Sequence, residues 1–464
     1  MTSSRRTIAW LRGDLRLDDN PALAEAHARG TDGCTAVYLL DDAFWSKHHW
    51  GPARRGMSLR GVAAMRPRLA DAGIDLRILT TATRSAEDVI ADACRASGAT
   101  EVHANREFGV NEHRRDEVVA NRLAEANVDF RRHHDQTILP VEEIRSGAGT
   151  PYTVFTPFKK KWLKLLEASG VPVPIEPPGP PVSPTTDARF VDEIDLDAAL
   201  RDVPESAFEA GEAEPRRRLE AFLDGPVERY HDDRDPPSLD GTSTLSPWLA
   251  CGSISPRRIL RMLTDRFGED PASWQEGPAT WLSELIWREF YRHVMDGIPK
   301  LSMDRPLHGW TDRVEWREDE AGFTAWCDGR TGIAIVDAGM RQMAATGWMH
   351  NRVRMITATF LAKHLLIDWR RGERFFMHQL VDGDFPSNNG GWQWAASTGT
   401  DAAPYFRIFN PDRQAERFDP EATYIRRWVP EYDGPGSMKP IVDLKAARVR
   451  AIETFKSAKN AVTA

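Results

Sequence analysis

The sequence predicts an α/β domain, built on a doubly wound parallel sheet, that a long linker joins to an all-α domain. Two observations carry this prediction: short apolar runs alternate with helical stretches over the first third of the chain, and strand signals disappear in its second half. At 464 residues the chain exceeds what one hydrophobic core usually serves, and its 41% hydrophobic content suffices for two. We therefore expect domains at 1–135 and 212–464, with the linker at 136–211.

The first 135 residues have the rhythm of βαβ units. Five short runs, TIAWL, CTAVYLL, LRILT, TEVHA and VDFRRH, have the length and composition of strands, and helical stretches such as MSLRGVAAMRPRLADAG separate them. This alternation predicts the parallel sheet. The segment after the first run, LRGDLRLDDNPAL, contains no GxGxxG, so ordinary NAD binding is not supported.

The rest of the chain changes character twice. Proline becomes dense between GTPYTVFTPFKKKW and VPVPIEPPGPPVSPTTD, as is typical of an extended connector. Beyond residue 212, the stretches WLSELIWREFYRHVMDG and GWMHNRVRMITATFLAKHLLIDW carry apolar residues at the helical spacing of 3.6. The second domain is therefore expected to be mainly helical.

Composition excludes several classes of protein. The cysteines are far apart, and no histidine cluster has ligand spacing, so we expect neither a disulfide framework nor a metal site. No apolar run is long enough to cross a bilayer, and no signal peptide is evident, so we expect a soluble cytoplasmic protein. The net charge of -8 does not exclude nucleic acid, because residues 341–410 hold 8 basic and 5 acidic residues.

Two helical segments place polar groups among apolar ones. In WLSELIWREFY, Glu284 and Trp287 share one helix stripe, which presents a carboxyl beside an indole. In GWMHNRVRMITATF, Asn351 and Met355 lie one turn apart. A solvated glutamate and a packed tryptophan are the ordinary interpretation of each residue alone, and a bound ligand is the alternative.

Two loop-like segments stand out as well. In residues 230–252, four hydroxyl-bearing positions precede a helix start, where they suit either a phosphate or plain N-capping. In residues 382–411, the run Asn-Asn-Gly-Gly is unfavourable in a packed helix or strand, so we expect a turn that serves a ligand.

Taken together, these segments resemble the photolyase/cryptochrome family, and within it the class I cyclobutane pyrimidine dimer photolyases of bacteria. The resemblance runs from WLRGDLRLDDNPAL through GTSTLSPWLACG, ELIWREFYRH, GWMHNRVRMI and DWRRGERFF to DGDFPSNNGGWQW. It implies an antenna domain, a helical domain that holds FAD, and a monomer that binds UV-damaged DNA with the dimer flipped out. The implied lyase reaction is light-driven: FADH⁻ lends one electron to the dimer, the ring opens, and the electron returns.

The resemblance also implies site residues. Asn388 would face flavin N5, and Arg354 would pair with Asp382 beside the ring. The full FAD set is Tyr230, Thr242, Ser243, Thr244, Leu245, Ser246, Arg354, Asp382, Gly383, Asp384 and Asn388. The dimer would meet Glu284, Trp287, Asn351, Arg352, Met355 and Trp394, and its flanking phosphates Arg234 and Arg407. An electron relay would run through Trp392, Trp369 and Trp316.

The antenna and the choice of lesion rest on fewer residues. Asn111 and Glu112 match the pair with which folate-using members hold methenyltetrahydrofolate, whereas Met303 stands where some of these members carry lysine. Methenyltetrahydrofolate is therefore favoured, and 8-hydroxy-deazaflavin is the alternative. The order HNRVRM is that of dimer photolyases, and Asn388 stands where plant cryptochromes carry aspartate. A cryptochrome-type photoreceptor, a (6-4) photolyase and an ordinary flavin oxidoreductase are the competing functions.

Overall fold

A computed structural model describes residues 5–179, 189–402, 404–434, 436 and 438–461. The chain divides into two compact units, which are described separately. Unit 1 comprises Met1–Ile144, Lys161–Asp224 and Ser243–Trp274, and unit 2 comprises Arg145–Lys160, Gly225–Thr242 and Gln275–Ala464. Part of the proline-rich stretch predicted as a linker, residues 180–188, lies outside the described residues.

Unit 1 contains the predicted α/β domain. Its five strands are all parallel and have the order β3-β2-β1-β4-β5. The elements of its α/β part are β1 (Arg6–Leu11), α1 (Pro21–Arg29), β2 (Cys34–Leu40), α2 (Asp42–Lys47), α3 (Pro52–Asp71), β3 (Asp75–Thr80), α4 (Ala86–Ser97), β4 (Ala99–Asn105), α5 (Val110–Glu125), β5 (Asp129–His133) and the 3₁₀ turn Val141–Glu143. The order reverses direction at β1, so the prediction of a doubly wound sheet is confirmed.

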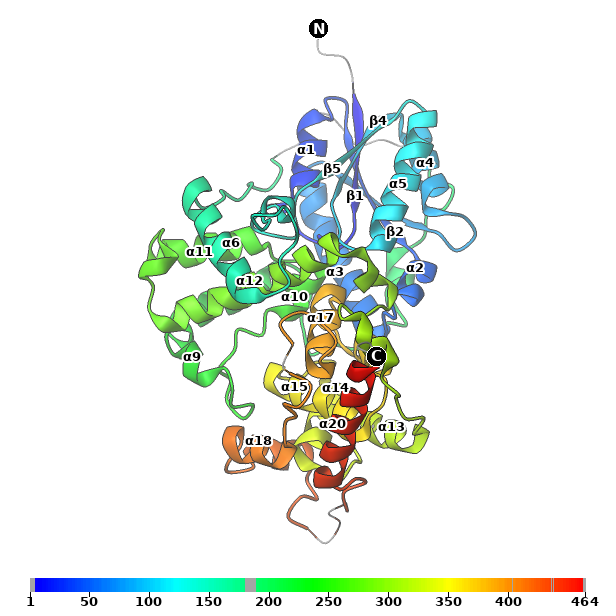
Figure 1. Cartoon of the computed structure of the whole chain (residues 1–464). Coiled ribbons are helices and arrows are strands. Elements are labelled where there is room, and N and C mark those ends of the chain that lie inside the picture. Colours follow the sequence, from blue (N-terminus) through cyan, green and yellow to red (C-terminus); the bar gives the residue numbers. More distant parts are fainter. Residues whose placement is uncertain (1–4, 180–188, 403, 435, 437, 462–464) are drawn as a thin grey trace. The chain divides into compact units, whose positions relative to one another are not determined.

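The sheet is covered by helices on both sides, with α1 on one side and α4 and α5 on the other (Figure 1). Ile8 and Trp10 of β1 pack with Val89 of α4 and Val119 of α5 in one buried cluster. Both faces of the central strand are therefore dry, which explains its unbroken apolar sequence.

Four helices and a 3₁₀ turn from later in the chain also belong to unit 1, namely α7 (Leu196–Leu200), α8 (Ala213–Leu223), α10 (Ser246–Cys251), α11 (Pro256–Phe267) and Pro271–Ser273. Arg257 of α11 pairs with Asp19 at 2.9 Å and with Asp135 at 3.0 Å, and all three side chains are buried. These buried ion pairs join Arg257 to residues that lie 238 and 122 positions earlier in the chain. Unit 1 thus includes segments that the predicted boundary at 212 assigns to the helical domain.

The predicted linker contains a helix that its proline-rich flanks conceal. Helix α6 (Phe155–Ser169) crosses the boundary between the units. Phe155, Phe158, Trp162 and Leu166 are all less than 9% exposed and recur at helical spacing. The extended connector predicted for this stretch is corrected accordingly.

The described residues of unit 2 form helices and loops and contain no β-strand, as predicted. Its α-helices are α9 (Tyr230–Asp233), α12 (Glu276–Gly297), α13 (Glu320–Cys327), α14 (Ala334–Thr346), α15 (Asn351–Thr359), α16 (Trp369–Gln379), α17 (Phe385–Ala396), α18 (Pro411–Phe418), α19 (Thr423–Trp428) and α20 (Leu444–Asn460). Short 3₁₀ turns lie at Pro226–Arg229, Pro299–Met303 and Gly309–Arg313, and a π-helix, η6, at Phe360–Leu365.

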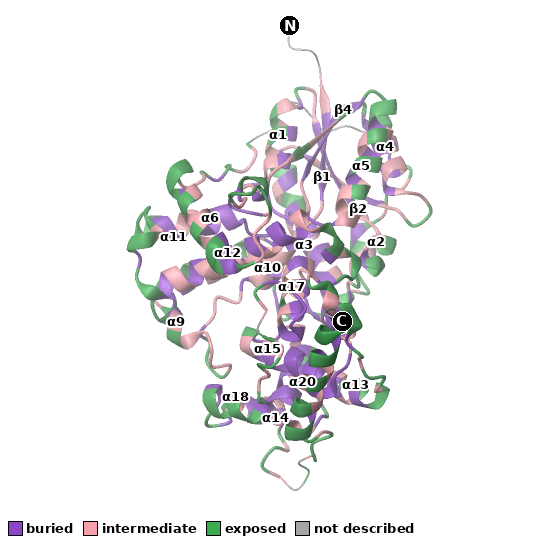
Figure 2. Cartoon of the chain, viewed as in Figure 1, coloured by how far each residue is buried: buried purple, intermediate pink, exposed green. Residues whose placement is uncertain are grey.

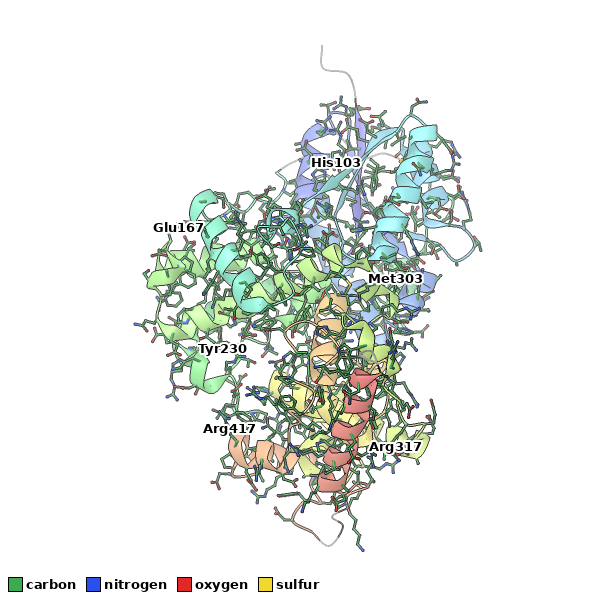
Figure 3. All side chains as sticks on the ribbon, viewed as in Figure 1. His103, Glu167, Tyr230, Met303, Arg317 and Arg417 are labelled. Atoms are coloured by element: carbon green, nitrogen blue, oxygen red, sulfur yellow. The ribbon has the colours of Figure 1, made fainter. Side chains whose placement is uncertain are left out.

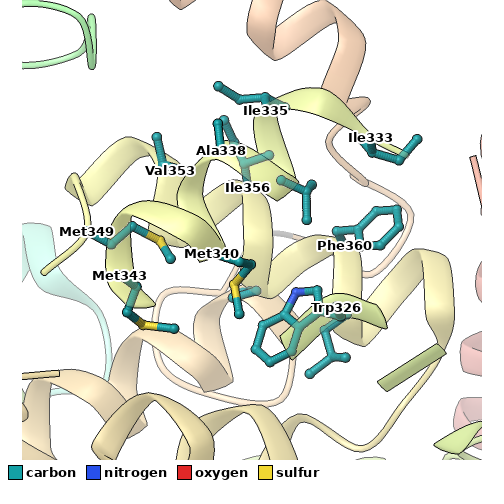
Figure 4. Packing of buried hydrophobic residues seen from close by; sticks show 14 of the residues in the cluster. Trp326, Ile333, Ile335, Ala338, Met340, Met343, Met349, Val353, Ile356 and Phe360 are labelled. Atoms are coloured by element: carbon teal, nitrogen blue, oxygen red, sulfur yellow. The ribbon is translucent and has the colours of Figure 1, made fainter. Parts of the chain in front are cut away.

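The core of unit 2 is a cluster of apolar side chains from α13 to α19. Trp326, Met340, Ile356 and Phe360 meet in it (Figure 4), and each is no more than 1% exposed. Figure 2 shows buried segments on α14 and α17, whereas much of α18 is exposed. Cys34, Cys94 and Cys251 are buried and Cys327 is half-buried, as expected of small apolar residues.

Candidate functional site

Helix α12 of unit 2 carries the predicted carboxyl and indole. Trp287 stacks on Phe155 with ring centroids 3.7 Å apart and planes 6° apart, and Tyr291 contacts the same indole at 5.6 Å. Phe155 is buried, so one face of the indole is covered by protein. Trp287 itself is only half-buried and is held in one orientation by these rings.

Glu284, one turn before Trp287, forms an ion pair with Arg234. The Nη1 atom of Arg234 donates to Oε1 of Glu284 at 2.5 Å, across 50 residues of sequence. Burial raises the pKa of Glu284 above its ordinary value, and the positive charge of Arg234 acts in the opposite direction. Burial and the charge of Arg234 thus shift the pKa of Glu284 in opposite directions. Removing either one changes the fraction of Glu284 that is protonated.

Sequence reasoning missed Asp235, which links the two predicted DNA-binding arginines of this region. Its Oδ1 accepts a hydrogen bond from Nη2 of Arg352 at 2.6 Å and lies 3.8 Å from Nε of Arg234. The guanidinium of Arg352 also lies over the ring of Phe418, 4.4 Å from its centroid. The only sequence signal was an acid next to Arg234, which is too common to single out.

The turn predicted at Asn-Asn-Gly-Gly is wrong, because these four residues lie inside helix α17. A Cβ at Gly390 would come within 2.1 Å of the Tyr291 ring, so close packing of α12 on α17 requires this glycine. By contrast, a Cβ at Gly391 would meet no atom within 4 Å. Packing therefore explains Gly390, and open space beside Gly391 leaves room for a flat ligand.

Two ion pairs flank the start of α17. Nη2 of Arg354 lies 2.8 Å from Oδ2 and 3.0 Å from Oδ1 of Asp382, so the predicted pair is present. Asp384 caps the helix and pairs with Arg292 at 2.6 Å. Burial acts to raise the pKa of Asp384, but the charges of Arg292 and Arg288 outweigh it and hold the pKa at about 2.

Asn388 shares a face of α17 with Gly391, three residues on. Its Nδ2 donates to the carbonyl oxygen of Glu373 at 3.0 Å, which fixes the amide. No donor among the described residues reaches its Oδ1. A fixed acceptor beside open space suits the N5–H of a reduced flavin, so the residues present fit FAD. Gly383 lies nearby in sequence. A Cβ at this position would lie 3.3 Å from the carbonyl oxygens of Leu380 and Met377.

The three tryptophans of the predicted relay all belong to the apolar clusters of unit 2. Trp392 is 2% exposed and Trp369 is 0% exposed, whereas Trp316 is half-buried. Trp392 contacts Trp326 edge-on at 6.0 Å, and Trp316 contacts Phe455 of α20 in the same manner at 5.8 Å. Of the three, Trp316 is thus the most exposed, as expected of the outer end of the relay.

The remaining candidates in unit 2 lie at its surface or partly below it. Asn351 begins α15 and is exposed, as is Arg407, whereas Met355 and Trp394 are half-buried. Tyr230 is 7% exposed, labelled in Figure 3, and lies under the guanidinium of Arg234 at 5.5 Å. Thr242 is the last residue of its segment of unit 2, whereas Ser243, Thr244, Leu245 and Ser246 belong to unit 1. Helix α10 begins at Ser246, as predicted.

The antenna candidates lie in unit 1, on α5. Nδ2 of Asn111 is 3.5 Å from Nε2 of His48, and Oε1 of Glu112 is 3.6 Å from the same nitrogen. Burial, reinforced by the negative charge of Glu107, raises the pKa of Glu112 to about 7. These residues thus form a buried polar group, and α5 follows β4 at the point where the strand order reverses.

The described part of the chain contains no group of three or more His, Cys, Asp or Glu residues placed to hold a metal ion. Among the same residues, no helix combines the length and apolarity that a membrane span requires.

Comparison with known proteins gives a consistent result along the chain. Residues 7–180 match the family model for DNA photolyase, and residues 281–439 match the model for the FAD binding domain of DNA photolyase. The deoxyribodipyrimidine photo-lyase of Escherichia coli is 41% identical over 97% of this chain and 98% of its own length. The enzyme of the same name from Salmonella typhimurium is 42% identical, with the same coverage.

Solved structures agree with these sequence relationships. A bacterial class III photolyase from Agrobacterium tumefaciens is similar with a TM-score of 0.87 and 33% identity, over 99% of this chain and 98% of that one. A cryptochrome from Synechocystis is similar with a TM-score of 0.86 and 26% identity, over 97% of this chain and 99% of that one. The fold is therefore common to repair enzymes and a cryptochrome, and the site must distinguish them.

Proposed function

The chain belongs to the DNA photolyase family, and we propose that its helical unit repairs cyclobutane pyrimidine dimers in UV-damaged DNA with the side chains assigned below. When bound, reduced FAD supplies the photoexcited electron that opens the cyclobutane ring and accepts it back. The protein's own residues then have three tasks: to position the dimer, to stabilise its negative charge and to hold the DNA strand.

Trp287 and Glu284 receive the dimer in this proposal. The half-buried indole, backed by Phe155, offers a flat apolar face to the flipped bases. Glu284 holds a proton at Oε1 or Oε2 and donates it toward a thymine carbonyl, where negative charge develops. The raised pKa of Glu284 supports this role, because the protonated carboxyl is the form that can donate. Asn351, Met355 and Trp394 complete the proposed pocket.

Arg234, Arg352 and Arg407 bind the phosphates beside the lesion in this proposal. Arg234 and Arg352 are held by Glu284 and Asp235 in the free protein. DNA phosphates must therefore compete with two internal carboxylates for these guanidinium groups. Such competition weakens binding to ordinary duplex DNA and leaves the affinity dependent on salt.

FAD is the cofactor, and Asn388 fixes its reduced form by accepting a hydrogen bond at Oδ1. Within unit 2, Arg354, Asp382, Gly383 and Asp384 are assigned to the flavin ring, and Tyr230 and Thr242 to the phosphates and ribose. For Ser243, Thr244, Leu245 and Ser246, which belong to unit 1, the FAD assignment rests on the motif resemblance alone. Trp316, Trp369 and Trp392 pass electrons inward to restore the reduced state. The greater exposure of Trp316 supports its place at the outer end.

Asn111 and Glu112 hold a light-harvesting cofactor in unit 1, with methenyltetrahydrofolate favoured over 8-hydroxy-deazaflavin. A carboxyl whose pKa is about 7 can exist in either protonation state near neutral pH and can therefore donate to or accept from the nitrogens of a pterin. We also propose that the protein works as a monomer in the cytoplasm.

The observation that carries repair over light sensing is the placement of Glu284, paired with Arg234, one turn from Trp287 on α12. A carboxyl beside a half-buried indole serves a flipped base, and a photoreceptor has no need of this pair. The test illuminates UV-irradiated oligothymidine with chemically reduced protein and follows the recovery of thymine absorbance. Repair requires recovery that depends on blue or near-ultraviolet light, and a cryptochrome-type photoreceptor, the second candidate, would give none.

A further inference from the structure

Glu284 is ion-paired in the free protein, whereas its proposed role requires a proton. Its Oε1 accepts a charge-assisted hydrogen bond from Nη1 of Arg234 at 2.5 Å, which favours the ionised carboxylate. A carboxylate only accepts hydrogen bonds, and only the protonated carboxyl can donate one to a thymine carbonyl. The pairing with Arg234 thus opposes the form of Glu284 that serves the dimer.

Arg234 is placed where DNA can draw it away from Glu284. Its side chain is 25% exposed, and its guanidinium lies 5.5 Å from the ring centroid of Tyr230, which is labelled in Figure 3. Nε of Arg234 lies 3.8 Å from Oδ1 of Asp235, which is too long for a hydrogen bond. A phosphate that binds the guanidinium in the bidentate geometry competes with Glu284 for Nη1 and brings its own negative charge beside the carboxyl.

The charges around Glu284 decide which form follows when this hydrogen bond is lost. Burial raises the pKa of Glu284, and the negative charge of Asp235 acts in the same direction. The charges of Arg234 and, more weakly, of Lys159 lower it. Lys159 is already engaged, because its Nζ donates to Oγ of Ser283 at 2.6 Å. Once Arg234 turns to a phosphate, the remaining groups favour the protonated carboxyl.

The other ionisable groups that face Glu284 do not change this balance. Burial raises the pKa of the hydroxyls of Tyr230 and Tyr291, so both stay uncharged near neutral pH. Helix α17, which packs on α12 at Gly390, carries no ionisable side chain. Within the described part of the chain, the charged groups named above therefore set the protonation of Glu284.

We propose that, when the dimer enters the pocket, Arg234 transfers its Nη1 hydrogen bond from Glu284 to a DNA phosphate and Glu284 takes up a proton from solvent. This inference rests on the proposed function and deepens it. The carboxylate and the solvent proton form the carboxyl that donates to the thymine carbonyl, and no electron moves in this step. Arg234 stays beside Glu284, with its charge now compensated by the phosphate. Lesion binding thus prepares the proton donor before light is absorbed.

This transfer makes lesion binding depend on pH with a definite sign. The pKa of Glu284 is higher in the complex than in the free protein, so a proton is taken up between the two values. The affinity for dimer-bearing DNA therefore rises as pH falls through that window, by at most about tenfold per pH unit for one proton. Above the pKa of the complex, Glu284 stays ionised and the dependence disappears.

The test titrates FAD-loaded protein in the dark with a duplex oligonucleotide that carries one cyclobutane thymine dimer. Calorimetry in buffers of different ionisation enthalpy, at constant salt and at a series of pH values, gives the number of protons taken up per dimer bound. We expect a bell-shaped dependence on pH with a maximum of at least about 0.5 proton, the value for a tenfold change in proton affinity. The same duplex without the dimer measures the preference for the lesion.

Three variants identify the group that takes up the proton. Glu284→Gln should bind the dimer without this uptake, because an amide does not titrate. Arg234→Met should take up less, because Glu284 then has no hydrogen bond to lose on binding. Arg407→Met is the matched control: it removes an exposed arginine that is proposed to bind a phosphate but is not among the groups that face Glu284. It should weaken binding and leave the uptake per bound dimer unchanged.

The results separate the proton uptake from the repair function. Uptake that is lost in Glu284→Gln, reduced in Arg234→Met and kept in Arg407→Met supports the transfer. Uptake that stays below the expected maximum at every pH, or that survives in Glu284→Gln, overturns it, and repair of the bound dimer on illumination then shows that the proposed function stands without it. If the parent neither prefers the dimer-bearing duplex nor repairs it, the proposed function is wrong and the transfer falls with it.

Discussion

Replacement of Arg234 by methionine tests how the protein controls the protonation of Glu284. The pair is a charge-assisted hydrogen bond of 2.5 Å whose side chains are 25% and 29% exposed. Charge-assisted bonds contribute about 1.5–3 kcal/mol and exposed ion pairs about 0.2–1 kcal/mol, so we expect a coupling of about 1–2 kcal/mol for this partly screened pair. A double-mutant cycle of Arg234→Met and Glu284→Gln, measured by urea unfolding of the apoprotein, gives this value.

The same change has a functional consequence with a definite sign. The folded-state pKa of Glu284 is raised, so the stability contributed by its protonated form is present below its ordinary pKa and is lost as pH rises through the folded value. Without Arg234, the smaller effect of the Lys159 charge is left to oppose burial, so the pKa rises further. If the protonated carboxyl assists ring opening, the repair yield of reduced enzyme at saturating DNA falls at a higher pH in Arg234→Met than in the parent.

Glu284→Gln is the control, because glutamine cannot titrate: its yield should be lower and should not change over the same pH range. Thymine absorbance recovery per absorbed photon, measured at each pH, provides the readout. The reasoning is refuted if Arg234→Met and the parent lose activity at the same pH, or if Glu284→Gln keeps the parental pH dependence.

Three further predictions follow from the site. Trp316→Phe should block photoreduction of oxidised FAD but spare repair by chemically reduced protein. Trp428→Phe, at a half-buried tryptophan, is the control and should change neither activity. If Trp316→Phe photoreduces its FAD at the parental rate, Trp316 is a packing residue. Gly390→Ala should destabilise the apoprotein by about 1–3 kcal/mol in thermal unfolding, because the added methyl group clashes with the Tyr291 ring. Gly391→Ala should stabilise the apoprotein by about 0.5–1 kcal/mol and yet weaken FAD binding. Equal effects of the two substitutions would contradict the proposed position of the flavin. Light should split cyclobutane dimers and leave (6-4) products intact, as measured by a chromatographic assay of both lesions. Equal repair of the two lesions would exclude the dimer-specific assignment.

The elements of unit 1 could be predicted because local sequence and tertiary structure agree there. The central strands are buried on both faces, so a run such as CTAVYLL is apolar except for Thr35 and ends where β2 ends. Helix α17 could not be predicted, because Asn-Asn-Gly-Gly opposes helix formation and only contact with Tyr291, about 100 residues earlier, explains Gly390.

In the site, as in the fold, local sequence could predict some features, and others depend on contacts between distant residues. Motif resemblance was sufficient to nominate Glu284, Arg234 and Arg352, because each lies in a recognisable segment. It could not indicate that Arg234 pairs with Glu284, or that Asp235 engages Arg352 across 117 residues. Pairing across such separations depends on how α9, α12 and α15 pack together. The periodicity of a local sequence does not predict that packing.

The stack of Trp287 on Phe155 has a thermodynamic consequence for lesion recognition. Immobilising a free side chain at an interface costs about 0.5–1.5 kcal/mol, and for Trp287 this loss of rotamer freedom occurs during folding. A flipped dimer therefore meets a surface that is already ordered, and its contact energy need not be spent on arranging that surface. Because Phe155 lies in the interval that the sequence marks as a connector, the entropy of binding is governed partly by a residue outside the helical domain's predicted limits.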